Sequence, residues 1–247
     1  MLIALYENAT PFEARMVDRM TPEPRAACLA LWPLGKMPVL RDEAGNQTFP
    51  ETSIIIDYLD QHYPGARPLL PRDPDAQLEA RLWDRLIDLY IHASMNARVN
   101  DRLRPEEKRD AISVAKANET FDIAYGLFER QLQGKTWVTG EAFTIADCAA
   151  APALFYAEAI HPFSKSHPLI AAYFERLLAR PSYARVLTEA RPFLQYFPFK
   201  EIWRRGILRG ESLRDHPCKS STPWRICKDP GSVMTAKAVI HVWQSHQ

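Results

Sequence analysis

The sequence predicts a mostly helical α+β protein, with a small mixed domain at residues 1–66 followed by an all-helical domain at residues 76–198. Three observations predict this arrangement. Residues 1–66 mix strand patterns with helix patterns, and residues 63–75 contain four prolines. From residue 76 to about residue 190, apolar residues recur at helical spacing. Because closely spaced prolines make a stiff, extended segment, we expect residues 67–75 to be the linker.

The first part of the mixed domain predicts a helix end, a strand and a second helix. Leu2–Tyr6 has the pattern of a last helical turn, with Asn8 as its left-handed stop. Phe12–Asp18 alternates apolar and charged residues, which predicts a strand. A proline at the first helical position is favourable, so a short helix is expected over Pro22–Leu31.

The second part of the mixed domain predicts a hairpin and a helix. Pro38–Arg41 and Gln47–Phe49 are short strand patterns separated by the turn sequence DEAGN. Ser53–His62 follows as a helix. The residues expected in the core at helical spacing are Ile54, Ile55, Tyr58 and Leu59.

Two apolar stripes predict long helices in the second domain. One stripe consists of Leu78, Leu82, Leu86, Leu89 and Ala93, and the other of Ala117, Phe121, Ala124, Phe128 and Leu132. Thr144–Glu158 is alanine-rich and predicts a buried central helix, whose start is marked by the capping-box spacing of Thr144 and Asp147. His167–Ala179 and Ser182–Ala190 predict two closing helices. Residues 199–247 have no sustained period and are expected to form an irregular tail.

Composition excludes several classes of function. The net charge of +1 argues against a nucleic-acid partner. No apolar run is long enough to span a membrane, and the first residues do not have the pattern of a signal peptide. The cysteines are too scattered for a metal site or a disulfide framework, which predicts reduced thiols and a cytoplasmic protein. They are Cys28, Cys148, Cys218 and Cys227.

The run LGKMPVL, which ends at Leu40, is the first candidate binding motif. A cis bond between Met37 and Pro38 would turn the chain sharply, since cis peptides are essentially confined to proline. The Met37 N–H and C=O would then be free to pair with an extended peptide ligand. The alternative is a trans proline at an ordinary edge strand.

The run PETS, at the start of the Ser53–His62 helix, is the second candidate motif. A helix N-terminus offers N–H groups and a partial positive charge, so Thr52 and Ser53 suit a ligand carboxylate. Glu51 suits a ligand ammonium. Together they fit the end of an α-amino acid, such as the γ-glutamyl end of glutathione. The alternative is simple helix capping by Thr52 or Ser53.

GKMPVL, a turn and PETSIIIDYL together resemble the glutathione-binding half of a glutathione transferase. WPLG at residues 32–35, WVTGEAFTIAD at residues 137–147 and RPSYARVL at residues 180–187 resemble further family motifs, so the resemblance covers roughly residues 1–195. It implies a thioredoxin-like first domain. It also implies that glutathione is the co-substrate, held by Met37 and Pro38 at its cysteinyl backbone and by Glu51, Thr52 and Ser53 at its γ-glutamyl group. Lys36 would meet its glycyl carboxylate or be a solvated surface residue.

The resemblance further implies a homodimer that transfers the glutathione thiolate to an electrophilic small molecule. In the family, the region of Tyr90, His92 and Met95 faces the electrophile, although a core position fits Tyr90 equally well. Four histidines that could each act as a base lack a neighbouring nucleophile motif, and we expect structural or surface roles for them. These four are His62, His92, His161 and His167.

One departure from the family pattern concerns the loop that contacts the glutathione sulfur. Placing Tyr6 or Thr10 in that loop leaves too few residues before Pro38 for the expected helix, strand and helix. The sequence fits better if the first strand and that loop are absent, as in a truncated member. The catalytic residue is then unknown, and the neighbours of the lost strand are expected to have unpaired edges. The alternative function is a non-catalytic glutathione-binding or interaction module.

Overall fold

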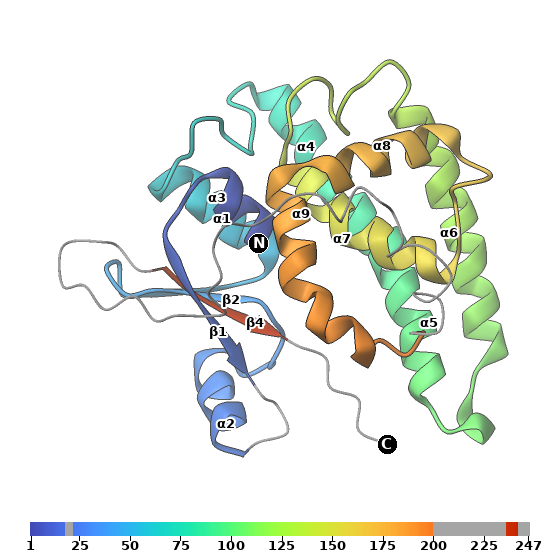
Figure 1. The fold of residues 1–247 in the computed structure, drawn as a ribbon, viewed down its shortest axis with the longest axis horizontal. Coiled ribbons are helices and arrows are strands. Elements are labelled where there is room, and N and C mark those ends of the chain that lie inside the picture. Colours follow the sequence, from blue (N-terminus) through green and yellow to red (C-terminus); the bar gives the residue numbers. More distant parts are fainter. Residues whose placement is uncertain (18–21, 200–235, 242–247) are drawn as a thin grey trace. The chain divides into compact units, whose positions relative to one another are not determined.

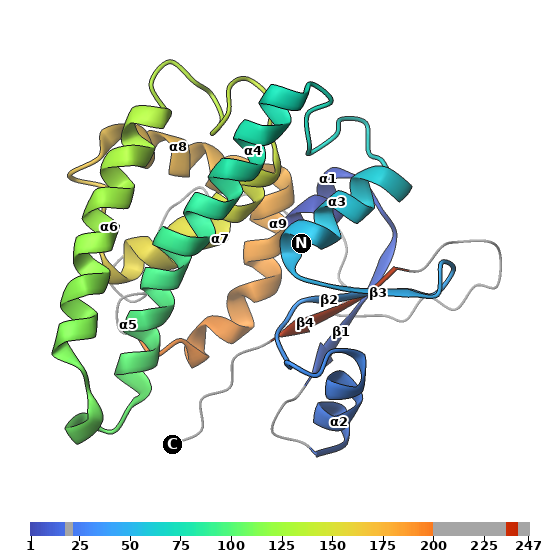
Figure 2. The same ribbon diagram turned by 180° about the vertical axis from the view of Figure 1, so that it is seen from behind.

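The computed structural model describes residues 1–17, 22–199 and 236–241, which divide into two compact units (Figures 1 and 2). Residues 1–67 and the strand at residues 236–241 form what we call the mixed unit, and residues 68–199 form the helical unit. This organisation confirms the predicted α+β fold class. Asp18, Thr21, Cys218 and Cys227 lie outside the described residues.

The mixed unit contains a four-stranded sheet with the strand order β1-β4-β2-β3. β4 runs parallel to β1 and antiparallel to β2, and β2 and β3 form an antiparallel hairpin. Helices α1 and α3 lie on one side of the sheet and α2 lies on the other (Figures 1 and 2). The elements are α1 (Leu2–Glu7), β1 (Phe12–Val17), α2 (Pro22–Leu31), β2 (Val39–Asp42), β3 (Gln47–Pro50), α3 (Thr52–His62) and β4 (Ala236–His241).

The core of the mixed unit confirms most of the predicted pattern and corrects two details. Leu5, Leu40, Ile55, Tyr58 and Leu59 pack together as one buried cluster. Ile54 is 49% exposed, whereas Ile56, which the spacing did not select, is buried. The left-handed residue that follows the first helix is also one position later than predicted. Asn8 has a right-handed helical conformation, and Ala9 has the positive φ of 51°.

Strand β4 is a departure from the predicted irregular tail. Its six residues pair with all six residues of β1, and four of them pair with β2. The expectation that the two neighbours of an internal strand would have unpaired edges is therefore wrong. A six-residue strand is too short for its alternating pattern to be recognised from the sequence alone. Its partner strands lie about two hundred residues away, so no neighbouring motif indicates the pairing either.

The helical unit is built around α7 (Ile145–Ile160). This helix packs against α4 (Pro74–Leu86), η1 (Ile87–His92), α5 (Ala93–Leu103) and α8 (Pro168–Ala179). Most of its side chains are buried, as its alanine-rich sequence predicts. The remaining elements are η2 (Glu106–Lys108), α6 (Ala111–Gln131), α9 (Pro181–Ala190) and η3 (Arg191–Tyr196). None of the helices in the described ranges combines the length and the apolar character that a membrane span requires.

The two predicted stripes of the helical unit have opposite outcomes. The α6 stripe from Ala117 to Leu132 is buried as predicted. The α4 stripe is wrong, because Leu78, Leu82 and Leu89 are 67%, 53% and 49% exposed. The consecutive helical segments α4, η1 and α5 form one rod from Pro74 to Leu103. A second set of apolar residues at helical spacing on this rod is buried against the rest of the helical unit instead. Its members are Ala80, Ile87, Ile91 and Met95.

Candidate functional site

The β2–β3 hairpin brings the two predicted binding motifs to the same end of the sheet. Val39, the first residue of β2, is paired with Pro50, the last residue of β3. Met37 and Pro38 come directly before this pair, and Glu51 directly after it. The Met37–Pro38 peptide bond is cis, which confirms the sequence prediction.

The start of α3 supplies the second half of this candidate site. Glu51 is the N-cap residue, with φ 66° and ψ 120°, and its exposed side chain makes no capping hydrogen bond. Thr52 and Ser53 occupy the first two helical positions rather than the N-cap, so neither takes the capping position considered in the alternative interpretation. A left-handed conformation is uncommon for a residue other than glycine, and such residues cluster at ligand sites. The partial positive charge of the helix start favours an anion beside the Glu51 carboxylate.

The turn before the cis peptide depends on Gly35. Its φ is +62°, and an added Cβ would lie 3.1 Å from the Leu29 side chain. Glycine adopts this backbone conformation without steric cost, so Gly35 allows the chain to enter the motif. The next residue, Lys36, has an exposed side chain that is accessible to an anionic group.

Asp42 organises the opposite, turn end of the hairpin. Its carboxylate accepts hydrogen bonds from the hydroxyls of Tyr58 at 2.5 Å and Tyr63 at 2.6 Å. It also accepts from the N–H groups of Ala44 and Gly45 in the turn. Burial by itself raises the pKa of Asp42, but these four hydrogen bonds outweigh it and the pKa lies below its ordinary value. Asp42 therefore fixes α3 and the turn to β2.

The structure does not bring Tyr6 or Thr10 to the Met37 end of the sheet. Phe12 pairs with the residue of β4 that also pairs with Asp42, so β1 begins at the turn end of the hairpin. The Tyr6 ring packs against Phe12, with 5.4 Å between ring centroids. The Thr10 hydroxyl is buried, and the described residues give it no hydrogen-bond partner.

The three residues predicted to face an electrophile lie along one rod of the helical unit. Tyr90 is 46% exposed, His92 is partly buried and Met95 is only 5% exposed. Burial lowers the pKa of His92, and the charge of Asp88 partly opposes that effect. Tyr90 and His92 belong to the π-helical segment η1, and such segments are frequent at functional sites. Because the rod turns Tyr90 outward and Met95 inward, the three side chains do not form one surface.

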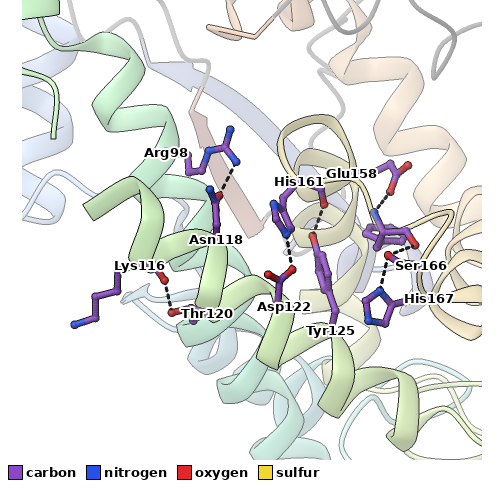
Figure 3. Close-up of polar contacts among 11 residues, drawn as sticks. Arg98, Lys116, Asn118, Thr120, Asp122, Tyr125, Glu158, His161, Ser166 and His167 are labelled. Atoms are coloured by element: carbon purple, nitrogen blue, oxygen red, sulfur yellow. Dashed lines mark hydrogen bonds and ion pairs between the residues drawn. The ribbon is translucent and has the colours of Figure 1, made fainter. Parts of the chain in front are cut away.

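A separate group of polar side chains lies in the helical unit, around the end of α7 and the following loop (Figure 3). His161 Nε2 lies 2.7 Å from Asp122 Oδ1 on α6. The Tyr125 hydroxyl donates to the His161 carbonyl oxygen at 3.0 Å. Ser166 Oγ lies 2.9 Å from His167 Nδ1. The first two contacts join the end of α7 to α6, and the third lies within the loop that follows.

This second group does not have the geometry of a hydrolase site. A catalytic triad needs one histidine that contacts both a hydroxyl and a carboxylate. Among the side chains drawn in Figure 3, His161 has the carboxylate partner and His167 has the hydroxyl partner. The Phe121 ring also stacks on His161, with 5.1 Å between ring centroids. We assign the group to packing of the loop. Within the described ranges, no cluster of three or more His, Cys, Asp or Glu residues could hold a metal ion.

Comparison with known proteins gives the same two-part division. The family model "Glutathione S-transferase, N-terminal domain" matches residues 1–67, and "Glutathione S-transferase, C-terminal domain" matches residues 86–181. Glutathione S-transferase U25 of Arabidopsis thaliana is 30% identical over 206 residues, which are 79% of this chain and 86% of that protein. The glutathione S-transferase-like protein LUC7 of a Fusarium species is 32% identical over 148 residues, but the match spans only 64% of its length and 60% of this chain.

Solved structures include a similar protein in complex with a glutathione derivative. The glutathione S-transferase of Methylobacterium radiotolerans, in complex with glutathione sulfonate, superimposes with a TM-score of 0.64. It is 32% identical to this chain, and the match covers 74% of this chain and 86% of that one.

Proposed function

The chain belongs to the glutathione S-transferase superfamily, and from this premise we propose that its mixed unit binds glutathione and that the protein transfers the glutathione thiolate to an electrophilic small molecule. The observation that carries the proposal is the shared end of the β2–β3 hairpin. There the cis Met37–Pro38 peptide lies next to the start of α3. The complex of the Methylobacterium relative with glutathione sulfonate supports the choice of ligand.

The proposed contacts follow the chemistry of the tripeptide. The backbone N–H and C=O of Met37 pair with the cysteinyl backbone in the manner of an added strand. The α-carboxylate of the γ-glutamyl group lies at the start of α3, near Thr52 with Ser53 as a secondary contact, and its ammonium pairs with Glu51. Lys36 is placed to meet the glycyl carboxylate.

The proposed reaction is nucleophilic attack by sulfur. The thiol first loses its proton to solvent, because the thiolate is the nucleophile. The sulfur then donates an electron pair to an electrophilic carbon. A carbon–sulfur bond forms, and the displaced pair leaves with the departing group or on an adjacent atom. Holding both reactants together makes the step effectively unimolecular, which lowers its barrier. Of the three residues predicted to contact the electrophile, Tyr90 is the one whose exposed side chain is accessible to it, and we propose that it makes this contact.

A glutathione-binding module without turnover is the second candidate function. It is favoured by the position of Tyr6 and Thr10 at the turn end of the sheet, away from Met37. Without a residue that stabilises the thiolate, the thiol would remain largely protonated at neutral pH. A conjugation assay with a chloronitroaromatic electrophile separates the two candidates. Turnover supports the transferase, whereas binding without turnover supports the module.

The binding site is tested by calorimetric titration of the full chain with glutathione. Replacing Glu51 by Gln removes a charge-assisted hydrogen bond, so we expect Kd to rise by about tenfold or more. Glu43→Gln, at the turn end of the same hairpin, is the control and should leave Kd unchanged. No binding by the unmodified chain, or an equal effect of both substitutions, would contradict the proposal.

We also propose that the protein acts as a homodimer. The rod formed by α4 and η1 exposes three leucines, Leu78, Leu82 and Leu89, along one face. Several large apolar side chains aligned on one exposed face are typical of protein interaction sites. Two copies of this face would shield the leucines from water in a symmetric contact.

A further inference from the structure

The central strand of the glutathione-binding sheet comes from the C-terminal end of the chain. β4 lies between β1 and β2 in the strand order. β1 pairs with it over six residues, from Phe12 to Val17, and β2 over four, from Val39 to Asp42. β1 and β2 are not neighbours in the sheet, so β4 is the element that connects them.

Removing β4 would leave the ligand-binding hairpin without support on one side. Backbone N–H and C=O groups in a buried strand need hydrogen-bond partners, and β2 would keep only those from β3. An isolated two-stranded hairpin is marginally stable at best in water. Leu40, in the middle of β2, is fully buried in the core of the mixed unit. The position of β2 therefore depends on β4 as well as on helix α3, which packs against β2.

The register places the last residues of β4 at the ligand end of the sheet. Val239 pairs with Val39, the first residue of β2. Ile240 and His241 continue past this pair, in the direction of the Met37–Pro38 peptide. β4 therefore spans the whole of β2 and extends to the end where the candidate site lies.

We propose that residues 236–241 are a positioning element of the glutathione site, so that ligand binding by residues 36–53 requires this segment from the other end of the chain. The inference rests on the proposed function for its ligand. The strand contacts that support it are independent of that function. Its consequence is that changes near the C-terminus act on a site formed by residues about two hundred positions earlier in the sequence.

The test compares two truncations of the full chain. Deletion of residues 236–247 removes β4, whereas deletion of residues 242–247 keeps it and is the matched control. We expect the first deletion to raise the amide hydrogen exchange rates of residues 12–17 and 39–42 by orders of magnitude and to abolish calorimetric binding of millimolar glutathione. The control should retain slow exchange in both strands. Slow exchange in both strands after the larger deletion would overturn the proposal.

A second experiment guards against general misfolding of the truncated chain. Ala238→Pro removes a backbone donor in the middle of the central strand, where proline is poorly tolerated. It should accelerate exchange in residues 12–17 and 39–42 while the α6 and α7 segments stay protected. A synthetic peptide of residues 233–247 added to the truncated chain should restore slow exchange and binding. Failure of the peptide, together with unchanged exchange in Ala238→Pro, would overturn the proposal.

The two proposals fail in different ways. If the full chain binds no glutathione, but the deletion of residues 236–247 still accelerates exchange in β1 and β2, the proposed ligand is wrong, and what stands is the support that β4 gives to β1 and β2. If the full chain binds glutathione and the larger deletion binds it equally well, the role of the strand is wrong and the proposed ligand stands.

Discussion

The carboxylate of Asp42 connects β2, the hairpin turn and the C-terminal half of α3. It is 2% exposed and accepts two tyrosine hydroxyls and two backbone N–H groups. Replacing it by Asn removes the charge and turns an NH₂ group toward one pair of donors. We expect the free energy of unfolding to fall by about 2–4 kcal/mol, measured by urea denaturation at neutral pH. Glu23→Gln, on the exposed face of α2, is the control and should change it by less than about 0.5 kcal/mol.

The same carboxylate predicts a pH dependence of stability. The pKa of Asp42 is lower in the folded protein than its ordinary value, because its hydrogen bonds outweigh the effect of burial. A group with a depressed folded pKa stabilises the protein above its unfolded pKa, and this contribution is lost as the pH falls through the folded pKa. The difference in unfolding free energy between the unmodified chain and Asp42→Asn should therefore shrink below about pH 4. A difference that stays constant down to pH 2 would contradict this role.

Single residues were predicted from the sequence only where a local rule applies. The cis peptide at Met37–Pro38 and the helix start after Glu51 follow from short motifs, and both are confirmed. The sequence did not single out Asp42 at the start of the predicted turn, although Asp at the first position of a turn with Gly three residues later is a turn signal. Its contact with Tyr63 joins residues 21 positions apart and depends on where α3 ends. No pattern within one element contains that information.

At the scale of elements, the start of α7 is held by more contacts than its capping box predicts. Asp147 accepts from the Thr144 N–H at 2.8 Å and from the Val138 N–H at 3.0 Å. It also accepts the Tyr173 hydroxyl of α8 at 2.8 Å. Asp147→Ala leaves these buried donors without partners, so we expect a loss of about 3–5 kcal/mol in unfolding free energy. Glu119→Ala, on the exposed face of α6, should cost less than about 0.5 kcal/mol.

This expectation concerns folding and not chemistry. Circular dichroism and urea titration of both variants measure it directly. A loss below about 1 kcal/mol in Asp147→Ala would mean that water or a rearranged loop satisfies the Val138 and Thr144 N–H groups. The T-x-x-D spacing was visible in the sequence, whereas the link to Tyr173 was not, because it joins two helices.

Helix faces illustrate why periodicity alone is not sufficient. The rod from Pro74 to Leu103 carries two apolar stripes, and the sequence offered no means of deciding which one faces inward. The stripe that contains Ala80 and Ile87 packs into the helical unit, and the leucine stripe does not. On α6 the predicted stripe is the buried one. Burial is decided by the neighbouring helices, and a single helix does not encode them.

At the scale of the whole molecule, the order of helices and strands could be predicted, but the closure of the sheet could not. Most elements of residues 1–190 lie close to a predicted one, since they are specified by local pattern, caps and prolines, whereas most of α5 and the short η2 have no predicted counterpart. β4 is different, because pairing it with β1 and β2 joins the two ends of the chain. Contacts of such long sequence separation leave no periodic signal in a short segment.

The exposed leucine face predicts the assembly of the protein. If Leu78, Leu82 and Leu89 form a symmetric contact, a glutamate at position 82 would have to be buried without a partner, which costs several kcal/mol. We expect the unmodified chain to elute at twice the mass of one chain by size-exclusion chromatography with light scattering, and Leu82→Glu to elute as a monomer. Ile123→Glu is the matched control, because Ile123 is a similarly exposed apolar residue, 67% exposed, on a different helix, α6. It should remain dimeric. A monomeric unmodified chain, or dissociation by Ile123→Glu alone, would show that the leucine face does not hold two copies together.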